Sequence, residues 1–149
     1  MLAERSTLNM VRKFCCRGHS HRTALEARFC NLISDYQDRG KLEWLEVGYR
    51  FLILDSAKYE KPMKNERSVT YNADFVYQYR NRNGSKIVCI VDTKGVAANC
   101  DGIKRKILKT MLGKIARDML VDKVVFLEIK AADLQGKSED EIKSILFPR

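Results

Sequence analysis

At 149 residues the chain has the length of one domain, and its 45% apolar content is enough to form a hydrophobic core. Its 28 lysines and arginines outnumber 19 acidic residues, and the resulting net charge of +9 favours polyanionic partners, chiefly nucleic acid. No apolar run approaches the roughly 20 residues that span a bilayer, and the first residues lack a secretory segment, so we expect a cytoplasmic protein with no membrane partner.

Residues 1–20 are basic and show little apolar periodicity, which predicts a loosely ordered N-terminal arm before a single domain over 21–149. Within the arm, residues 15–21 (CCRGHSH) contain thiols and imidazoles, the side chains that bind zinc. Their spacing matches no familiar zinc knuckle, and a solvated arm explains the run equally well, so zinc is the weaker interpretation. The five cysteines of the chain are odd in number and lack framework spacing, which favours reduced thiols over disulfides.

The first predicted helix begins near Thr23 and ends at Gly40, because apolar residues between them recur at helical spacing. Glu26 lies beside the apolar stripe and also fits a capping box with Thr23, so a cap and a functional acid are both open interpretations. Residues 42–54 are rich in aromatic and branched side chains and predict a strand, with a bend at Gly48. A polar loop is expected over 55–67.

A two-stranded hairpin is predicted over 69–79 and 86–92, with the turn-rich residues 81–85 as its loop. If Arg80 faces Lys86, counting back six residues on each strand sets Asp74 opposite Asp92. Period-two alternation then turns Lys94 to the face of Asp92. A register shift of one residue would separate these side chains. Residues 87–91 are apolar on both faces, as in a strand covered by helices.

The remaining elements are a long amphipathic helix over 103–119, a buried strand over 123–129 and a short last helix that begins at a capping box over 138–141. Basic residues occupy the outer side of the long helix, and inward packing is considered for Lys106. The predicted order is thus helix, strand, two hairpin strands, helix, strand and a final helix.

This order and these residues resemble the core of the PD-(D/E)XK nuclease superfamily. Asp74 stands at the position of that family's first acid, and Asp92-Thr93-Lys94 stands as its (D/E)-x-K triplet. With residues 25–29 (LEARF), where Glu26 is the helical acid, and 91–95 (VDTKG), the chain resembles small phage-type endonucleases related to Holliday-junction resolvases. The resemblance implies an α/β fold with a restriction-endonuclease-like core, in which helices flank a mixed central sheet in the order α-β-β-β-α-β.

Two departures from the family pattern affect the first two strands. Asn72 and Ala73 replace the proline that often precedes the first acid, a position that shapes the turn rather than binding metal. Gly48 and Tyr49 stand where such relatives often carry a glutamine and a proline. The resemblance therefore assigns no substrate contacts near Glu46.

The implied activity is that of a metal-dependent endodeoxyribonuclease that hydrolyses phosphodiester bonds, at branched DNA such as Holliday junctions, and leaves a 5′-phosphate. Asp74 and Asp92 would hold one or two Mg²⁺ ions, for which Mn²⁺ substitutes, and Glu26 would complete the metal shell or orient water. Lys94 would stabilise the negative charge that develops on the phosphate. Symmetric incision of a junction implies a homodimer, and the resemblance implies action in DNA recombination, in the host cytoplasm if the chain is phage-encoded.

The candidate phosphate contacts are Lys104, Arg105 and Lys109 on the long helix, together with Arg22. The simpler interpretation of the three helical residues is a solvated helix face. Glu128-Ile129-Lys130 is a second acid-x-lysine triplet, which we reject as the site because no hairpin precedes it. The functional alternatives are a sequence-specific or flap/single-strand nuclease and a non-catalytic DNA-binding accessory protein.

Overall fold

The computed structural model describes residues 13–55, 57–59, 64–94 and 102–149. Most of the predicted basic arm, residues 1–12, lies outside the described residues. Gly95, which completes the predicted VDTKG motif, and Cys100 also lie outside them. The acids and the lysine of the predicted site all fall inside.

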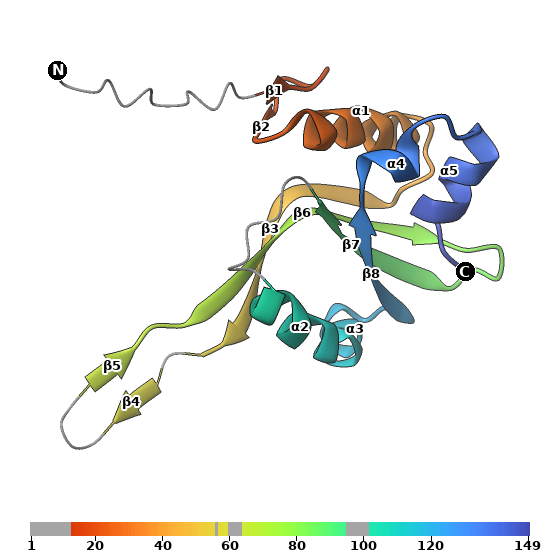
Figure 1. Ribbon diagram of the computed structural model, residues 1–149. Helices are drawn as coiled ribbons and strands as arrows, with labels where there is room; N and C mark the ends of the chain where they lie inside the picture. Colours follow the sequence, from red (N-terminus) through yellow and green to blue (C-terminus); the bar gives the residue numbers. More distant parts are fainter. Residues whose placement is uncertain (1–12, 56, 60–63, 95–101) are drawn as a thin grey trace, which may run out of the picture.

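A four-stranded mixed sheet forms the centre of the fold (Figure 1). Its strands are, in sheet order, β3 (Trp44–Leu54), β6 (Val69–Arg80), β7 (Lys86–Thr93) and β8 (Lys123–Ile129). The β3–β6 and β6–β7 pairs are antiparallel, whereas β8 is parallel to β7 and therefore needs a crossover connection. The predicted α/β class and the α-β-β-β-α-β order are confirmed, and the arrangement is consistent with a restriction-endonuclease-like core.

Helices cover both faces of the sheet (Figure 1). One face carries α1 (Ala24–Asp38), α4 (Ala131–Leu134) and α5 (Glu139–Leu146), and the other carries the crossover helices α2 (Gly102–Thr110) and α3 (Leu112–Met119). The predicted helix start at Thr23 and the capping box that opens α5 at Ser138 are both confirmed.

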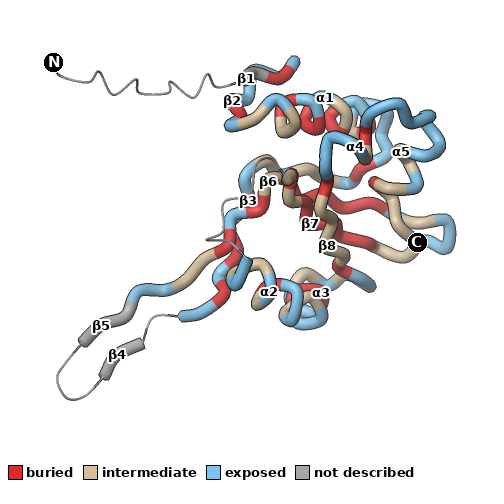
Figure 2. Tube along the Cα trace, in the orientation of Figure 1, coloured by how far each residue is buried: buried red, intermediate tan, exposed pale blue. Residues whose placement is uncertain are grey.

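Strand β7 supplies apolar side chains to two separate cores, and its buried course is visible in Figure 2. Ile87, Cys89 and Val91 pack in the core beneath α1, α4 and α5. Val88 and Ile90 pack in the core beneath α2 and α3. The prediction of a central strand buried on both faces is therefore confirmed, and burial of this kind is the main source of stability for the sheet.

Near Gly48 on β3 and Asp74 on β6, the apolar side chains of both strands switch from one face of the sheet to the other. Val47 packs on the α1 side of the sheet, yet Tyr49, two residues later, packs on the α2 side. Gly48 has φ of +76°, a conformation that glycine adopts at little cost, and the irregularity predicted there is confirmed. Asp74 consequently lies where the strand turns from one core to the other.

Two predictions of secondary structure are wrong. The predicted loop over 55–67 contains two short paired strands, β4 (Ala57–Tyr59) and β5 (Lys64–Glu66), which continue the β3–β6 pair away from the body of the sheet (Figure 1). The predicted helix over 103–119 is two helices, because the chain tightens at Met111, whose amide donates to the Leu108 carbonyl at 2.9 Å.

The part of the predicted arm after residue 12 is ordered. Strands β1 (Lys13–Phe14) and β2 (Ser20–His21) form a hairpin beside α1. Polar contacts tie its loop to that helix: the Cys16 amide donates to Asn31 Oδ1 at 2.7 Å, and Arg17 pairs with Asp38. These contacts reach residues 15 or more positions away in the chain, so local periodicity could not reveal them.

Candidate active site

The hairpin of β6 and β7 brings Asp74 and Asp92 to the same level of the sheet. Its pairing runs from Arg80 opposite Lys86 to Phe75 opposite Val91, as predicted. The next residue along each strand is Asp74 on β6 and Asp92 on β7. Both side chains are partly buried.

Thr93 holds the Asp74 carboxylate from the neighbouring strand. Its backbone amide donates to Asp74 Oδ2 at 2.7 Å, and its hydroxyl donates to the same oxygen at 2.8 Å. Burial raises the pKa of Asp74, the two bonds from Thr93 act to lower it, and the charge of Glu26 raises it again. The carboxylate is thus fixed in orientation in a place that disfavours its charge.

Asp92 faces the crossover helix α2. Its Oδ2 lies 3.1 Å from an Arg105 guanidinium nitrogen, and its side chain is only 17% exposed. Burial raises the pKa of Asp92, the charge of Asp74 raises it further, and Arg105 acts to lower it. The two aspartates therefore repel each other across the hairpin.

Glu26 joins this region from the first turn of α1. Its Oε2 accepts a hydrogen bond from the Arg22 amide at 3.1 Å and lies 3.9 Å from His21 Nδ1. Its own amide donates to the Thr23 hydroxyl, so one half of the predicted capping box is present. In place of the other half, the carboxylate accepts from the Arg22 amide rather than from the Thr23 amide. The carboxylate is 14% exposed, and its charge contributes to the raised pKa of Asp74.

The acids lie within electrostatic range of one another but are not packed as tightly as metal ligands. In the described part of the chain, one set of three or more potential ligand residues has all its ligand atoms within 4.8 Å. That set, called the Cys/His cluster below, consists of Cys15, His19, His21 and Cys30. Glu26, Asp74 and Asp92 do not form such a set.

Lys94 is engaged by an acid that the sequence prediction passed over. Its Nζ lies 2.9 Å from Glu128 Oε2, and Glu128 is the residue opposite Asp92 in the parallel β7–β8 pair. The rejected triplet therefore contributes its acid to the predicted site, although a hairpin does not precede it. The position of Glu128 depends on the crossover, whose register local sequence does not determine.

The basic residues of α2 are arranged differently from the prediction. Arg105 is 20% exposed and turns inward to Asp92, with a second contact of 3.7 Å to Glu128, so its predicted place on the outer face is wrong. Lys106, considered for inward packing, is exposed, and so is Ile103. Arg105 precedes the fully buried Leu108 by three residues and therefore shares its side of the helix.

Of the other three predicted phosphate contacts, Lys109 and Arg22 are exposed. Lys109 is 46% exposed, although its Nζ lies 3.2 Å from Glu128 Oε1 and 5.0 Å from the centre of the Phe126 ring. Lys104 is partly buried, and Arg22 is exposed. The Arg22 amide donates to Glu26 Oε2, and the charge of Arg22 acts to lower the pKa of Asp74.

None of the helices in the described residues has the length and apolar character needed to cross a membrane.

A family model described as a protein of unknown function, DUF1064, matches residues 9–130. This match includes every predicted catalytic residue and the whole Cys/His cluster. Comparisons with curated proteins and with solved structures find no match.

Proposed function

The chain belongs to the DUF1064 family, and we propose that it is a metal-dependent endodeoxyribonuclease of the PD-(D/E)XK type. Its reaction would be hydrolysis of DNA phosphodiester bonds. Asp74, Asp92 and Glu26 are the proposed cation ligands, and Lys94 is the proposed cationic residue at the scissile phosphate.

The observation that carries this proposal is that two partly buried aspartates lie side by side on a hairpin, where burial raises the pKa of both. Burying like charges together costs free energy unless a cation compensates them. Groups with strongly shifted pKa values cluster at functional sites. Two neighbouring aspartates of this kind therefore favour a functional site over a packing role.

The carboxylates suit a hard divalent cation such as Mg²⁺, which prefers oxygen ligands. The contacts described above engage one oxygen of each residue: Oδ2 of Asp74, Oδ2 of Asp92 and Oε2 of Glu26. The proposal assigns the second oxygen of each to the cation. Mn²⁺ accepts the same ligands and would substitute.

When bound, the cation would polarise the scissile phosphate and lower the pKa of a coordinated water. The protein's own residues would orient the metal-binding carboxylates and compensate the charges around them. Thr93 fixes the direction of the Asp74 carboxylate. Lys94 would stabilise negative charge on the phosphate. Arg105 compensates Asp92 in the absence of a cation and would release it when the cation binds.

The activity test is cleavage of a labelled synthetic four-way junction by the purified protein with Mg²⁺ or Mn²⁺. We expect cleavage by the wild type and at least a hundredfold loss in Asp92→Asn, on the order expected when charge stabilisation at a reaction centre is removed. Asp118→Asn is the matched control, because Asp118 is an exposed residue of α3 whose only described partner is Lys114. Intact junction under all metal and salt conditions, or equal rates for the two variants, would contradict the proposal.

Branched DNA is the proposed substrate because of the resolvase resemblance and the net charge of +9. Parallel assays on junction, flap, duplex and single-stranded DNA separate it from a sequence-specific or flap/single-strand nuclease. Paired cuts in a junction require two active sites, so we propose a homodimer, which light scattering after gel filtration would detect. A strict monomer would favour a nuclease that makes single nicks.

A non-catalytic DNA-binding accessory protein is the second candidate. The ion pairs of Asp92 with Arg105 and of Lys94 with Glu128 favour it, because both groups already have counter-charges within the chain. This candidate predicts DNA binding that weakens as salt rises but changes neither with Mg²⁺ nor in Asp74→Ala. Electrophoretic mobility shifts measured with Mg²⁺ and with EDTA distinguish the two functions.

A further inference from the structure

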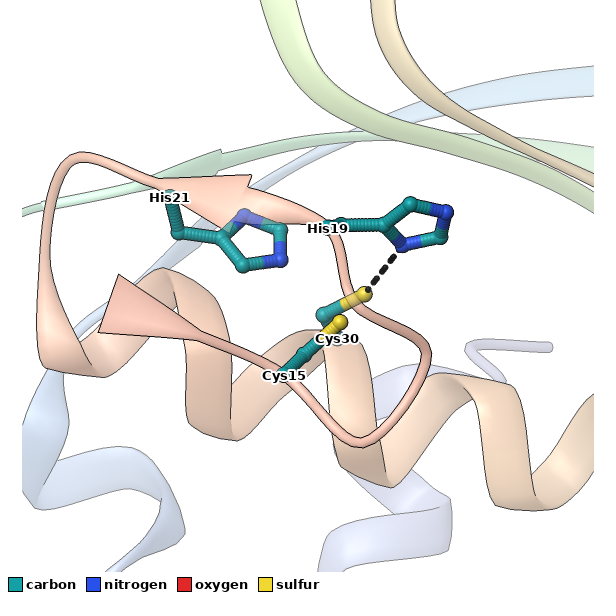
Figure 3. Close-up of side chains that lie close together, drawn as sticks. All are labelled: Cys15, His19, His21 and Cys30. Atoms are coloured by element: carbon teal, nitrogen blue, oxygen red, sulfur yellow. Dashed lines mark hydrogen bonds between the residues drawn. The ribbon is translucent and has the colours of Figure 1, made fainter. Parts of the chain in front are cut away.

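The Cys/His cluster lies outside the proposed nuclease site and has the composition of a zinc site. Three of its residues come from the β1–β2 hairpin, and Cys30 comes from α1 (Figure 3). The two sulfurs and the two imidazole rings gather between the hairpin and the helix (Figure 3). Two thiolates with two imidazoles form a Cys₂His₂ donor set, which binds Zn²⁺ tetrahedrally in structural sites.

The spacing of the ligand atoms fits one ion. His19 Nδ1 lies 3.4 Å from Cys30 Sγ, and all four ligand atoms lie within 4.8 Å of one another. Zinc bonds of about 2.3 Å to sulfur and about 2.0–2.1 Å to nitrogen put S and N about 3.5 Å apart in a tetrahedron. His19 Nδ1 and Cys30 Sγ already have this separation, and ligand atoms as far apart as 4.8 Å would close by about 1 Å on binding the ion.

Burial gives an independent indication of a ligand. Cys15, Cys30 and His21 are all buried, whereas His19 is exposed at the outer edge of the cluster. His21 Nε2 is buried and has no hydrogen-bond partner among the described residues. A buried polar atom without a partner destabilises the fold, and a metal bond would remove that cost.

The other ring nitrogen of His21 faces the proposed active site. Its Nδ1 lies 3.9 Å from Glu26 Oε2. A metal-binding histidine commonly directs its second nitrogen to a carboxylate, which fixes the orientation of the ring. Glu26 would be the carboxylate in this chain, and the zinc site would in turn restrict where Glu26 points.

The β1–β2 hairpin is too short to be stable without further contacts to the rest of the fold. Its strands have two residues each, and a pair that short is marginally stable in water. Gly18, with φ of +77°, makes the turn that brings Cys15 and His19 together. A metal that joins this turn to Cys30 would hold the hairpin on α1.

We propose that the Cys/His cluster binds one Zn²⁺ ion and that this ion fastens the β1–β2 hairpin to α1. The site is structural, because all four metal positions are filled by the protein. It does not depend on the proposed nuclease function, since it requires no reaction at Asp74 or Asp92.

The experiment measures metal content and spectra of the full chain after purification in Zn²⁺ and after exchange to Co²⁺. We expect about one Zn²⁺ per chain and, with Co²⁺, the thiolate charge-transfer and visible bands of tetrahedral coordination. Cys30→Ser and His21→Asn should lose stoichiometric metal or change the Co²⁺ spectrum. Cys16→Ser is the matched control, because Cys16 is an exposed neighbour outside the cluster and its loss should leave both readouts unchanged.

A second readout covers variants that fail to fold. Chelation of the wild type should lower its Tm, and added Zn²⁺ should restore it, because metal binding contributes to folding. Three results would overturn the proposal: no metal in the wild type after reconstitution, equal loss of metal in Cys16→Ser, or a Cys15–Cys30 disulfide in mass spectra of the protein prepared without oxidant.

Discussion

Thr93→Val tests whether the Asp74 carboxylate is held as the structure indicates. The substitution keeps a branched side chain at a position that is 8% exposed but removes the hydroxyl that donates to Asp74 Oδ2 at 2.8 Å. The backbone amide bond at 2.7 Å remains. A hydrogen bond to a charged group contributes about 1.5–3 kcal/mol, so we expect a loss of this size in the free energy of unfolding near neutral pH.

The loss should depend on pH in a defined direction. Burial already raises the folded-state pKa of Asp74, and removal of the hydroxyl raises it further. A carboxyl group with a raised folded-state pKa makes the fold relatively more stable as pH falls through that pKa. The deficit of Thr93→Val should therefore be complete above the folded-state pKa of Asp74 and should shrink as pH falls through it.

Urea unfolding followed by circular dichroism, at about pH 7.5 and about pH 4.5, measures both effects. Thr70→Val is the matched control, because Thr70 lies on the same strand as Asp74, is partly buried and pairs with Leu52 rather than with an acidic residue. A deficit equal to that of Thr70→Val, or one that stays constant between the two pH values, would refute this account of Asp74.

Arg105→Met should destabilise the protein by about 1–3 kcal/mol, because it leaves Asp92 without its counter-charge. If the acids bind a cation, Mg²⁺ should restore part of that lost stability in thermal melts. Gly48→Ala should cost about 1–2 kcal/mol in urea unfolding because of its positive φ, whereas Gly113→Ala, within α3, should stabilise by about 0.5–1 kcal/mol. Tyr77→Phe should cost about 1–2 kcal/mol in the same assay, since its buried hydroxyl donates to a backbone carbonyl of α5. A Tyr77→Phe protein as stable as the wild type would contradict that role.

Short-range patterns predicted the parts of the site that lie on one hairpin and one helix. The turn at 81–85 fixed the register because residue spacing in a hairpin follows directly from its loop, and the pairing of Arg80 with Lys86 followed. The start of α1 at Thr23, and with it the place of Glu26, followed from helical spacing and a capping residue. These features depend on neighbours within a few residues.

The parts that were missed depend on contacts between distant segments. Glu128 reaches Lys94 through a parallel pairing whose register is set by the crossover helices. Arg105 turns inward because the packing of Leu108 sets the rotation of α2, whereas apolar spacing alone had placed the basic residues on the outer side of that helix. Cys30 has the spacing of a core residue of α1, so its place beside His19 appears only once the hairpin is folded against that helix.

The anomalous scattering of a crystal soaked in Mn²⁺, with zinc distinguished by its own absorption edge, tests whether Asp74 and Asp92 bind a divalent cation. We predict a manganese peak in contact with carboxylate oxygens of Asp74 and Asp92, with Glu26 nearby and Arg105 moved away from Asp92. A soaked crystal in which Arg105 still binds Asp92, and no manganese lies at either aspartate, would contradict it.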